Sequence, residues 1–409
     1  MTGTEKIKIA IHLGDEIAEV GEMVTDRKNI FFRYNPSFIE KRIEISPFKL
    51  PLSTEIHTAN PYPFEGLFGV FYDSLPDGWG RLLLDRTLLK KGLLTEQVTP
   101  LDRLAIVGKK GMGALIYEPE FNIGEDFRNQ PDLDDIAREV EAILHGDSSG
   151  NIEALYQAAG SSGGARPKIL TGFNPLNNQI IPENEILPEG FEHWLVKFSS
   201  SADKSDAANI EFAFYKMALE AGIEMSPCNL FTGKSGRVYF GTKRFDRAGN
   251  QKIHLHSASG LLHDNFRQST MDYGHLMDCA FRLENHINAY RKILRLAAFN
   301  VFSHNRDDHS RNFAFLMDAS GDWKLAPAFD LTFSTSAFGM HSTSVAGETK
   351  SPGRTQLMEL ANHFKIKNAP EIIEQVVSAV RKWPSFAEEY GVSSVSISQI
   401  NSVIKRLTA

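Results

Sequence analysis

The segment that decides the fold reads Ser303-His-Asn-Arg-Asp-Asp-His-Ser-Arg-Asn-Phe-Ala-Phe-Leu316, with Leu325-Ala-Pro-Ala-Phe-Asp-Leu331 following shortly after it. The first stretch leads from a hydrophobic helix pattern into an apolar strand, and it places Asp307 five residues before Asn312. The second stretch places Asp330 after another short apolar strand. Phosphoryl transfer needs a carboxylate that accepts a hydroxyl proton, and amide and carboxylate oxygens that hold Mg²⁺ against phosphates.

The spacing of Asp307 and Asn312 equals that of protein kinase catalytic loops, and Arg306 precedes the aspartate as an arginine does there. The competing interpretation is a polar loop that only caps and turns the chain after a helix. His309 alone is weak evidence, because a single loop histidine usually hydrogen-bonds to nearby backbone. The complete arrangement favours a site of phosphoryl transfer.

A second cluster reads Ala159-Gly-Ser-Ser-Gly-Gly-Ala-Arg-Pro-Lys168. Small residues let backbone amides approach an anion closely, and Arg166 and Lys168 add positive charge for phosphates. The cluster matches neither the Walker pattern nor the dinucleotide-binding fingerprint, so a flexible linker remains the alternative.

A third feature is Lys197, which lies in the apolar strand pattern Trp194-Leu-Val-Lys-Phe198. A buried lysine needs an anionic partner, and Glu211 on the following helix is the candidate. Strand alternation could equally direct Lys197 to solvent.

Length and composition bound the remaining possibilities. A chain of 409 residues predicts two or three packed units. The net charge of −7 argues against wholesale neutralisation of nucleic acid phosphates as the main function. Two cysteines, Cys228 and Cys279, are too few for a disulfide framework. Without a signal-peptide pattern or a membrane-length apolar run, we expect a cytoplasmic protein that does not enter membranes.

Hydrophobic periodicity predicts a β-rich part followed by a helical part. Alternating residues over 5–50 indicate an antiparallel β unit, and residues 100–112 read as a helix. A helix over 207–222 ends at Gly222, which suits a left-handed cap. The clearest helix covers 287–302, where Ile287 opens a continuous apolar stripe.

These clusters, in this order, resemble the HipA family of bacterial toxin kinases, and the resemblance covers nearly the whole chain. It includes Phe64-Glu-Gly-Leu, Leu75-Pro-Asp-Gly-Trp-Gly-Arg81 and Lys243-Arg-Phe-Asp-Arg247. The resemblance implies an α+β, two-lobed protein-kinase-like fold with an N-terminal β-rich subdomain and a mostly helical C-terminal lobe. The expected divisions are an N-terminal subdomain at 1–145, a nucleotide-binding part with the phosphate loop at 146–248, and a helical lobe with the catalytic and metal-binding loops at 249–409.

The resemblance also implies roles for individual residues, with ATP and Mg²⁺ as cofactors. Asp307 would be the catalytic base, and Asn312 and Asp330 the metal ligands. The nucleotide would be bound by Gly163, Gly164, Ala165, Arg166, Pro167, Lys168, Lys197, Lys243, Arg244, Phe245, His309, Ser310, Arg311, Asn312, Phe329 and Asp330. Family members can carry an acidic residue at the position of Lys243. Because this chain has lysine there, only the backbone hydrogen bonds to adenine are expected at that position, and not a role of the acidic side chain.

Family members autophosphorylate a serine before the phosphate loop, and this modification silences the kinase. By register the serine is Ser161, with Ser162 adjacent. The resemblance further implies a HipB-like helix-turn-helix antitoxin, contact with operator DNA mainly through that antitoxin, and a translation protein such as an aminoacyl-tRNA synthetase as substrate. A catalytically silent co-repressor and a small-molecule kinase remain alternatives.

Overall fold

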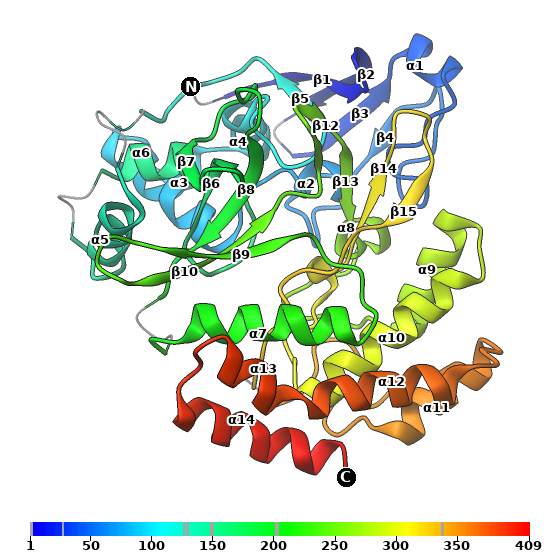
Figure 1. Ribbon diagram of the computed structural model, residues 1–409. Coiled ribbons are helices and arrows are strands. Elements are labelled where there is room, and N and C mark those ends of the chain that lie inside the picture. The colour runs from blue at the N-terminus through cyan, green and yellow to red at the C-terminus, as the bar shows by residue number, and fades with distance from the viewer. Residues whose placement is uncertain are drawn as a thin grey trace. The chain divides into compact units, whose positions relative to one another are not determined.

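The computed structural model describes residues 3–26, 28–125, 127, 131–147, 151–200, 204–336 and 339–409. The chain forms two compact units. Unit 1 contains Met1–Lys204, Phe231–His256 and Leu316–Gly321, and unit 2 contains Ser205–Leu230, Ser257–Phe315 and Asp322–Ala409. The chain passes between the units after Lys204 and after Gly321, and within β9 (Cys228–Thr232), β13 (His254–Ser257) and β14 (Ala314–Met317). Figure 1 labels these three strands. The predicted mixture of helix and sheet in two parts is confirmed.

The first sheet of unit 1 has the strand order β4-β3-β2-β1-β5. Alternate residues of β1 are buried, which is the pattern of a sheet with one face on a core. The predicted antiparallel unit is therefore confirmed as far as Tyr34. Beyond it the prediction was wrong, because Asn35 caps a short helix that Pro36 opens. The strands are β1 (Lys6–Leu13), β2 (Glu16–Thr25), β3 (Ile30–Tyr34), β4 (His57–Thr58) and β5 (Leu115–Glu118), and the helix is α1 (Pro36–Glu40).

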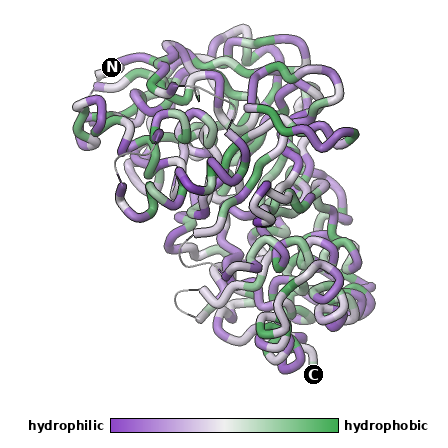
Figure 2. Tube along the Cα trace, turned by 60° about the vertical axis from the view of Figure 1, so that its left-hand side comes forward, coloured by the Kyte–Doolittle hydropathy of each residue, from purple (hydrophilic) through white to green (hydrophobic). Residues whose placement is uncertain are grey.

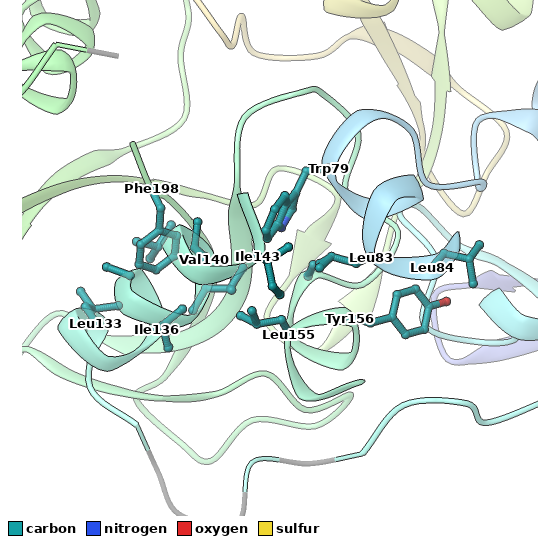
Figure 3. Close-up of a cluster of buried hydrophobic side chains, with 14 of the residues drawn as sticks. Trp79, Leu83, Leu84, Leu133, Ile136, Val140, Ile143, Leu155, Tyr156 and Phe198 are labelled. Carbon is teal, nitrogen blue, oxygen red and sulfur yellow. The ribbon is translucent and has the colours of Figure 1, made fainter. Parts of the chain in front are cut away.

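The second sheet of unit 1 has the strand order β7-β6-β8-β10-β9. Trp194 and Val196 of β8 join a buried cluster with Leu83 of α3, Ile136 of α5 and Leu155 of α6 (Figure 3). This apolar packing fixes the helices on one face of the sheet. The strands are β6 (Lys168–Asn174), β7 (Gln179–Pro182), β8 (Glu192–Lys197) and β10 (Val238–Lys243), and the helices are α3 (Gly78–Lys90), α5 (Leu133–Leu144) and α6 (Ile152–Ala159).

The helix predicted over 100–112 is shorter than expected. Helix α4 (Pro100–Val107) begins at a Thr99 capping box and ends where Gly108 takes a φ of 54°. A left-handed glycine stops the helix there and lets the chain turn back. The remaining short elements are α2 (Gly69–Tyr72), η1 (Thr95–Gln97), β11 (Arg247–Ala248), β12 (Gln251–Lys252) and β15 (Trp323–Leu325).

Unit 2 is mostly helical. Phe214 of α7 packs against Trp383, with ring centroids 5.1 Å apart, and both side chains are fully buried. The predicted helix at 287–302 is confirmed as α10, although Ile287 precedes it and is exposed. The helices are α7 (Ala207–Glu220), α8 (Ala258–Leu262), α9 (Tyr273–Glu284), α10 (Asn288–Ser303), η2 (Ser310–Asn312), α11 (Arg354–His363), α12 (Ala369–Arg381), α13 (Trp383–Glu389) and α14 (Ser394–Leu407).

Gly222 ends α7 as the sequence predicted. Its φ is +78°, and its backbone N–H donates to the Leu219 carbonyl at 2.9 Å. The Ile223 N–H donates to the Ala218 carbonyl at 3.0 Å, which completes a Schellman motif.

Hydrophobic and hydrophilic residues alternate at short intervals along the trace (Figure 2). Within the described ranges, none of the helices combines the length and the apolar character that crossing a bilayer requires.

We predict that Gly222→Ala lowers the free energy of unfolding by about 1–2 kcal/mol, because a Cβ is strained at a left-handed φ. Gly222→Asn should cost less, since asparagine tolerates this conformation. Urea unfolding followed by tryptophan fluorescence measures both variants. Equal losses for alanine and asparagine would contradict the capping role.

Candidate functional site

The loop that carries Asp307 follows α10 in unit 2. His304 ends the helix with a left-handed φ of 59°. The Asp307 side chain is 58% exposed. The Asn312 side-chain amide donates from Nδ2 to the Asp307 carbonyl at 2.7 Å, which closes the loop on itself. This bond uses the amide nitrogen and leaves Oδ1 as the part of the Asn312 side chain that can bind a cation.

The segment that carries Asp330 is fastened to the same loop. Asp330 has a left-handed φ of 57°. Four residues later, the Ser334 N–H donates to the His304 carbonyl at 3.0 Å, and the Arg306 N–H donates to the Ser334 carbonyl at 3.2 Å. The rings of His304 and Phe333 stack with centroids 5.0 Å apart. Unit 2 therefore brings the two predicted metal-binding segments side by side.

The donor set of these two segments fits Mg²⁺. Asn312 offers an amide oxygen and Asp330 a carboxylate, and Mg²⁺ prefers such hard oxygen ligands. The proximal Asp307 carboxylate is largely exposed, as a group that must reach a reacting hydroxyl has to be. Asn312 and Asp330 therefore offer oxygen donors of the kind that Mg²⁺ binds.

Two residues between Asp307 and Asn312 lie close to Phe266. The His309 ring lies 5.6 Å from the Phe266 ring, and the Arg311 guanidinium lies 5.1 Å from it. The Ser310 hydroxyl donates to Asp264 at 2.5 Å and is fully buried. Ser310 therefore anchors the loop, whereas the side chains of His309 and Arg311 lie near the Phe266 ring.

Asp308 was not singled out from the sequence, yet it organises the loop. Its side chain has no exposed surface. The Tyr273 hydroxyl donates to this carboxylate at 2.9 Å, the Ser342 N–H donates at 2.8 Å, and His341 Nδ1 lies 3.0 Å away. Burial, and then the Asp308 charge, raise the pKa of Tyr273 well above its usual value, so its hydroxyl remains a donor. The adjacent pair Asp307-Asp308 was the only signal in the sequence for such a residue, and it does not indicate which of the two aspartates is buried.

The glycine-rich loop lies in unit 1, between α6 and β6. Ser161 and Ser162 are buried, whereas Gly163 and Ala165 are exposed. The Ser161 hydroxyl accepts a hydrogen bond from the Met112 N–H at 2.8 Å, and the Ser162 hydroxyl donates to the Ala159 carbonyl at 2.7 Å. The loop is therefore held by its serines and presents its small residues outward.

The start of α3 holds this loop from behind. The Asp77 carboxylate accepts a hydrogen bond from the Gly164 N–H, and the Trp79 N–H donates to the Gly164 carbonyl at 3.1 Å. A Cβ at Gly78 would lie 2.5 Å from that carbonyl oxygen and 2.7 Å from Ala165 Cα, so only glycine fits there. The Pro-Asp-Gly-Trp stretch is typical of a turn. Its contact with the glycine loop could not be predicted from the sequence, because Gly164 lies 87 residues after Asp77.

Two predicted phosphate-binding lysines share one face of the second sheet. Lys168 of β6 pairs directly with Lys197 of β8, and Lys197 pairs with Phe240 of β10. Directly opposed residues in antiparallel strands point to the same side. The Lys168 ammonium donates to the Gly163 carbonyl, and the Lys197 ammonium lies 5.6 Å from the centre of the Phe240 ring.

The predicted hinge at Lys243 to Phe245 begins at the end of β10. Lys243 forms an ion pair with Glu192 at 2.6 Å. The Arg244 side chain is buried and donates to Asp246 from Nε at 3.0 Å and from Nη2 at 2.9 Å. Burial opposes ionisation of Asp246, but Arg244 and Arg247 outweigh it and hold the pKa of this carboxyl below its usual range. The Arg244 side chain thus stabilises the hinge, and its backbone N–H donates to the His193 carbonyl at 2.9 Å.

The predicted site residues fall into two groups. Unit 1 holds the glycine loop, Arg166, Pro167, the two lysines and the hinge, and unit 2 holds Asp307, the 309–312 segment, Phe329 and Asp330. Glu211, the proposed partner of Lys197, is a buried residue of α7 in unit 2. That pairing stays a prediction.

Comparison with known proteins gives matches to family models and to solved structures. Residues 160–383 match the HipA-like C-terminal domain family, and residues 10–118 match the HipA N-terminal domain family. HipA of Shewanella oneidensis MR-1, solved with HipB and operator DNA, superposes with a TM-score of 0.67 over 98% of this chain and 96% of that chain, at 17% identity. The Helicobacter pylori proinflammatory kinase CtkA is more remote, with a TM-score of 0.37 over 55% of this chain and 85% of its own, at 12% identity. No curated protein matches the chain at a significant level.

We predict that Gly78→Ala destabilises unit 1 more than Gly92→Ala. Both glycines have a positive φ, but a Cβ at Gly92 would meet nothing within 4 Å. The difference between the two losses in stability measures the clash of the new Cβ with the glycine loop, and we expect it to be about 1–3 kcal/mol. Thermal unfolding measures both variants, and an equal loss would show that the loop does not press on Gly78.

We predict that Asp308→Asn lowers the free energy of unfolding by about 3 kcal/mol, because an amide cannot accept from all the donors that face the carboxylate. The matched control is Asp278→Asn on α9, where the side chain is exposed and little change is expected. Chemical unfolding measures the difference. Equal stability of the two variants would remove Asp308 from its anchoring role.

Proposed function

This chain belongs to the HipA family, whose C-terminal domain alone matches more than half of its 409 residues, and we propose that it is an ATP-dependent serine/threonine protein kinase. The observation that carries the proposal is the placement of an exposed Asp307 beside Asn312 and the Asp330 segment. Carboxylate, amide and carboxylate in this order are the parts of a phosphoryl-transfer site.

In the proposed reaction Asp307 accepts the proton of the attacking hydroxyl while that oxygen bonds to the γ-phosphorus of ATP. The bond from this phosphorus to the departing ADP oxygen breaks in the same displacement. Bound Mg²⁺ would supply charge neutralisation at the phosphate oxygens, and Asn312 and Asp330 would hold it. Asp308 acts only through the loop, so it is a positioning residue.

Unit 1 would contribute the phosphate-binding part. The exposed backbone of Gly163 and Ala165, with Lys168 and Lys197 on one sheet face, forms a positive surface suited to phosphate oxygens. Release of Gly164 from Asp77 would free one more backbone N–H for the nucleotide. The hinge backbone from Lys243 to Phe245 would meet adenine. Arg166, Pro167, His309, Ser310, Arg311 and Phe329 complete the proposed nucleotide site.

We further propose regulation by autophosphorylation at Ser161 or Ser162. Both hydroxyls are hydrogen-bonded and buried, so the loop has to leave α3 before either can be modified. A phosphate adds about −1.5 to −2 charge, which favours water over the buried position. The modified loop would therefore stay outside and leave ATP without its cradle.

The partners follow from the same proposal. The related Shewanella structure contains HipB and operator DNA, which supports a HipB-like antitoxin that carries the DNA contact here. We propose a translation protein such as an aminoacyl-tRNA synthetase as the substrate, a cytoplasmic location, and the three-part division at residues 145 and 248. The mildly acidic chain agrees with DNA binding by a partner.

We predict that purified protein incubated with Mg·ATP gains phosphate on Ser161 or Ser162, detected by mass spectrometry. Asp307→Asn should reduce the rate roughly 10²- to 10⁴-fold, because the base is lost. Asp278→Asn, which changes an exposed aspartate of α9 in the same unit, should retain the wild-type rate.

The outcomes separate the alternatives. Protein that binds ATP without transferring phosphate to itself or to any protein of a cell lysate would instead be a silent co-repressor. Phosphate transfer to a metabolite and to no protein would indicate a small-molecule kinase.

A further inference from the structure

Unit 1 contains a cavity of about 790 Å³ that the proposed kinase reaction does not use. It lies between the β6–β7 hairpin and helices α5 and α6, and its volume is in the range of small-molecule sites. Among the described residues that line it, Arg244 is the only member of the predicted nucleotide set, and of the 159–168 cluster only Gly160, at its start, contributes to the lining. The cavity is therefore distinct from the proposed phosphate site.

The cavity has an apolar wall. Ile136 of α5, Ala154 and Ala158 of α6, and Ile180 and Ile181 of β7 contribute to it. These aliphatic side chains offer a surface for the flat or branched hydrocarbon part of a ligand.

The described lining is also rich in positive charge. It contains six basic and three acidic residues, which are Lys109, Lys110, Lys234, Arg244, Arg247 and Lys252 against Asp132, Glu183 and Glu185. Lys109 and Lys252 share the single carboxylate of Glu185, at 3.3 and 3.1 Å. No acidic side chain in the described ranges lies within ion-pair distance of Lys110.

The side chains of Arg244, Arg247 and Lys252 are buried, so positive charge that their carboxylate partners do not balance is costly there. Burial lowers the pKa of Lys252, with Glu185 opposing this effect and Arg247 adding to it. Burial likewise lowers the pKa of Arg247 to about 10, against the attraction of Asp246. An anion entering the cavity would relieve this like-charge repulsion.

Glu183 supplies one unused acceptor in the same cavity. Its Oε1 accepts from Arg244 at 2.9 Å and lies 2.9 Å from His193 Nδ1. Its Oε2 is buried and has no hydrogen-bond partner among the residues that the structure describes. A buried acceptor left unsatisfied costs free energy, so a ligand with an N–H or O–H group at this point would gain a bond.

We propose that this cavity binds a small organic anion that has an apolar body and one hydrogen-bond donor. The anionic group meets Lys109, Lys110 and Lys252, the apolar body lies on the Ile180–Ile181 wall, and the donor meets Glu183 Oε2. The inference needs no kinase activity, so it can fail or succeed independently of the proposed function.

The test uses the full chain and two fluorescent probes. Anilinonaphthalene sulfonate carries an aromatic body, an N–H donor and a negative charge, and N-phenylnaphthylamine is its neutral analogue. We expect saturable one-to-one binding of both probes, with the sulfonate bound more tightly. Saturating Mg·ATP should displace neither probe.

The decisive variant is the double charge reversal Lys109→Glu/Lys110→Glu, in which both lysines are exposed. It should weaken sulfonate binding by about tenfold, or about 1.4 kcal/mol, and leave the neutral probe within about twofold. The matched control Lys8→Glu/Lys28→Glu makes the same charge change at exposed residues of unit 1 outside the cavity. Retained sulfonate binding in the first variant, an equal loss in the control, or displacement by Mg·ATP would overturn the proposal.

Discussion

A buried carboxylate that must be satisfied is the constraint on which the candidate site in unit 2 depends. Asp308 has no exposed surface, so its charge is stable only while the Tyr273 hydroxyl, His341 and the backbone after it keep facing it. Those donors come from α9 and from the segment after Asp330. The hydrogen bonds to the buried Asp308 therefore fix the loop, while Asp307, the preceding residue, remains exposed to solvent.

In unit 1 the glycine loop is held through hydrogen bonds to the backbone of Gly164 rather than through a network of side chains. The Asp77 carboxylate and the Trp79 N–H bind both polar groups of the Gly164 peptide from behind. The approach is possible only because Gly78 has no Cβ. In both units an acidic residue therefore holds a segment of the candidate site in place: Asp77 binds the glycine loop, and Asp308 binds the segment after Asp330.

The features that were predicted correctly are those that depend on residues close together in the sequence. The left-handed end of α7 at Gly222 and the helix that leads to Asp307 follow from glycine conformation and apolar periodicity. It could not tell which of two adjacent aspartates is buried, because burial depends on Tyr273 and His341, which lie 35 and 33 residues away. The Asp77 contact is equally non-local. The predicted helix over 100–112 was too long, because Gly108 ends α4 after the apolar residues of 101–107.

Under the proposed function, the contacts of Ser161 and Gly164 would give the glycine loop a held state and a released state. In the held state the Ser161 hydroxyl accepts from the Met112 N–H, and both polar groups of the Gly164 peptide are bound by the start of α3. These bonds share one short segment, so they form or break together rather than one at a time. A charge placed on Ser161 cannot remain in a site that is 4% exposed and already hydrogen-bonded. Under the proposed function the loop would therefore be either held or released, and a single modification would decide between the two.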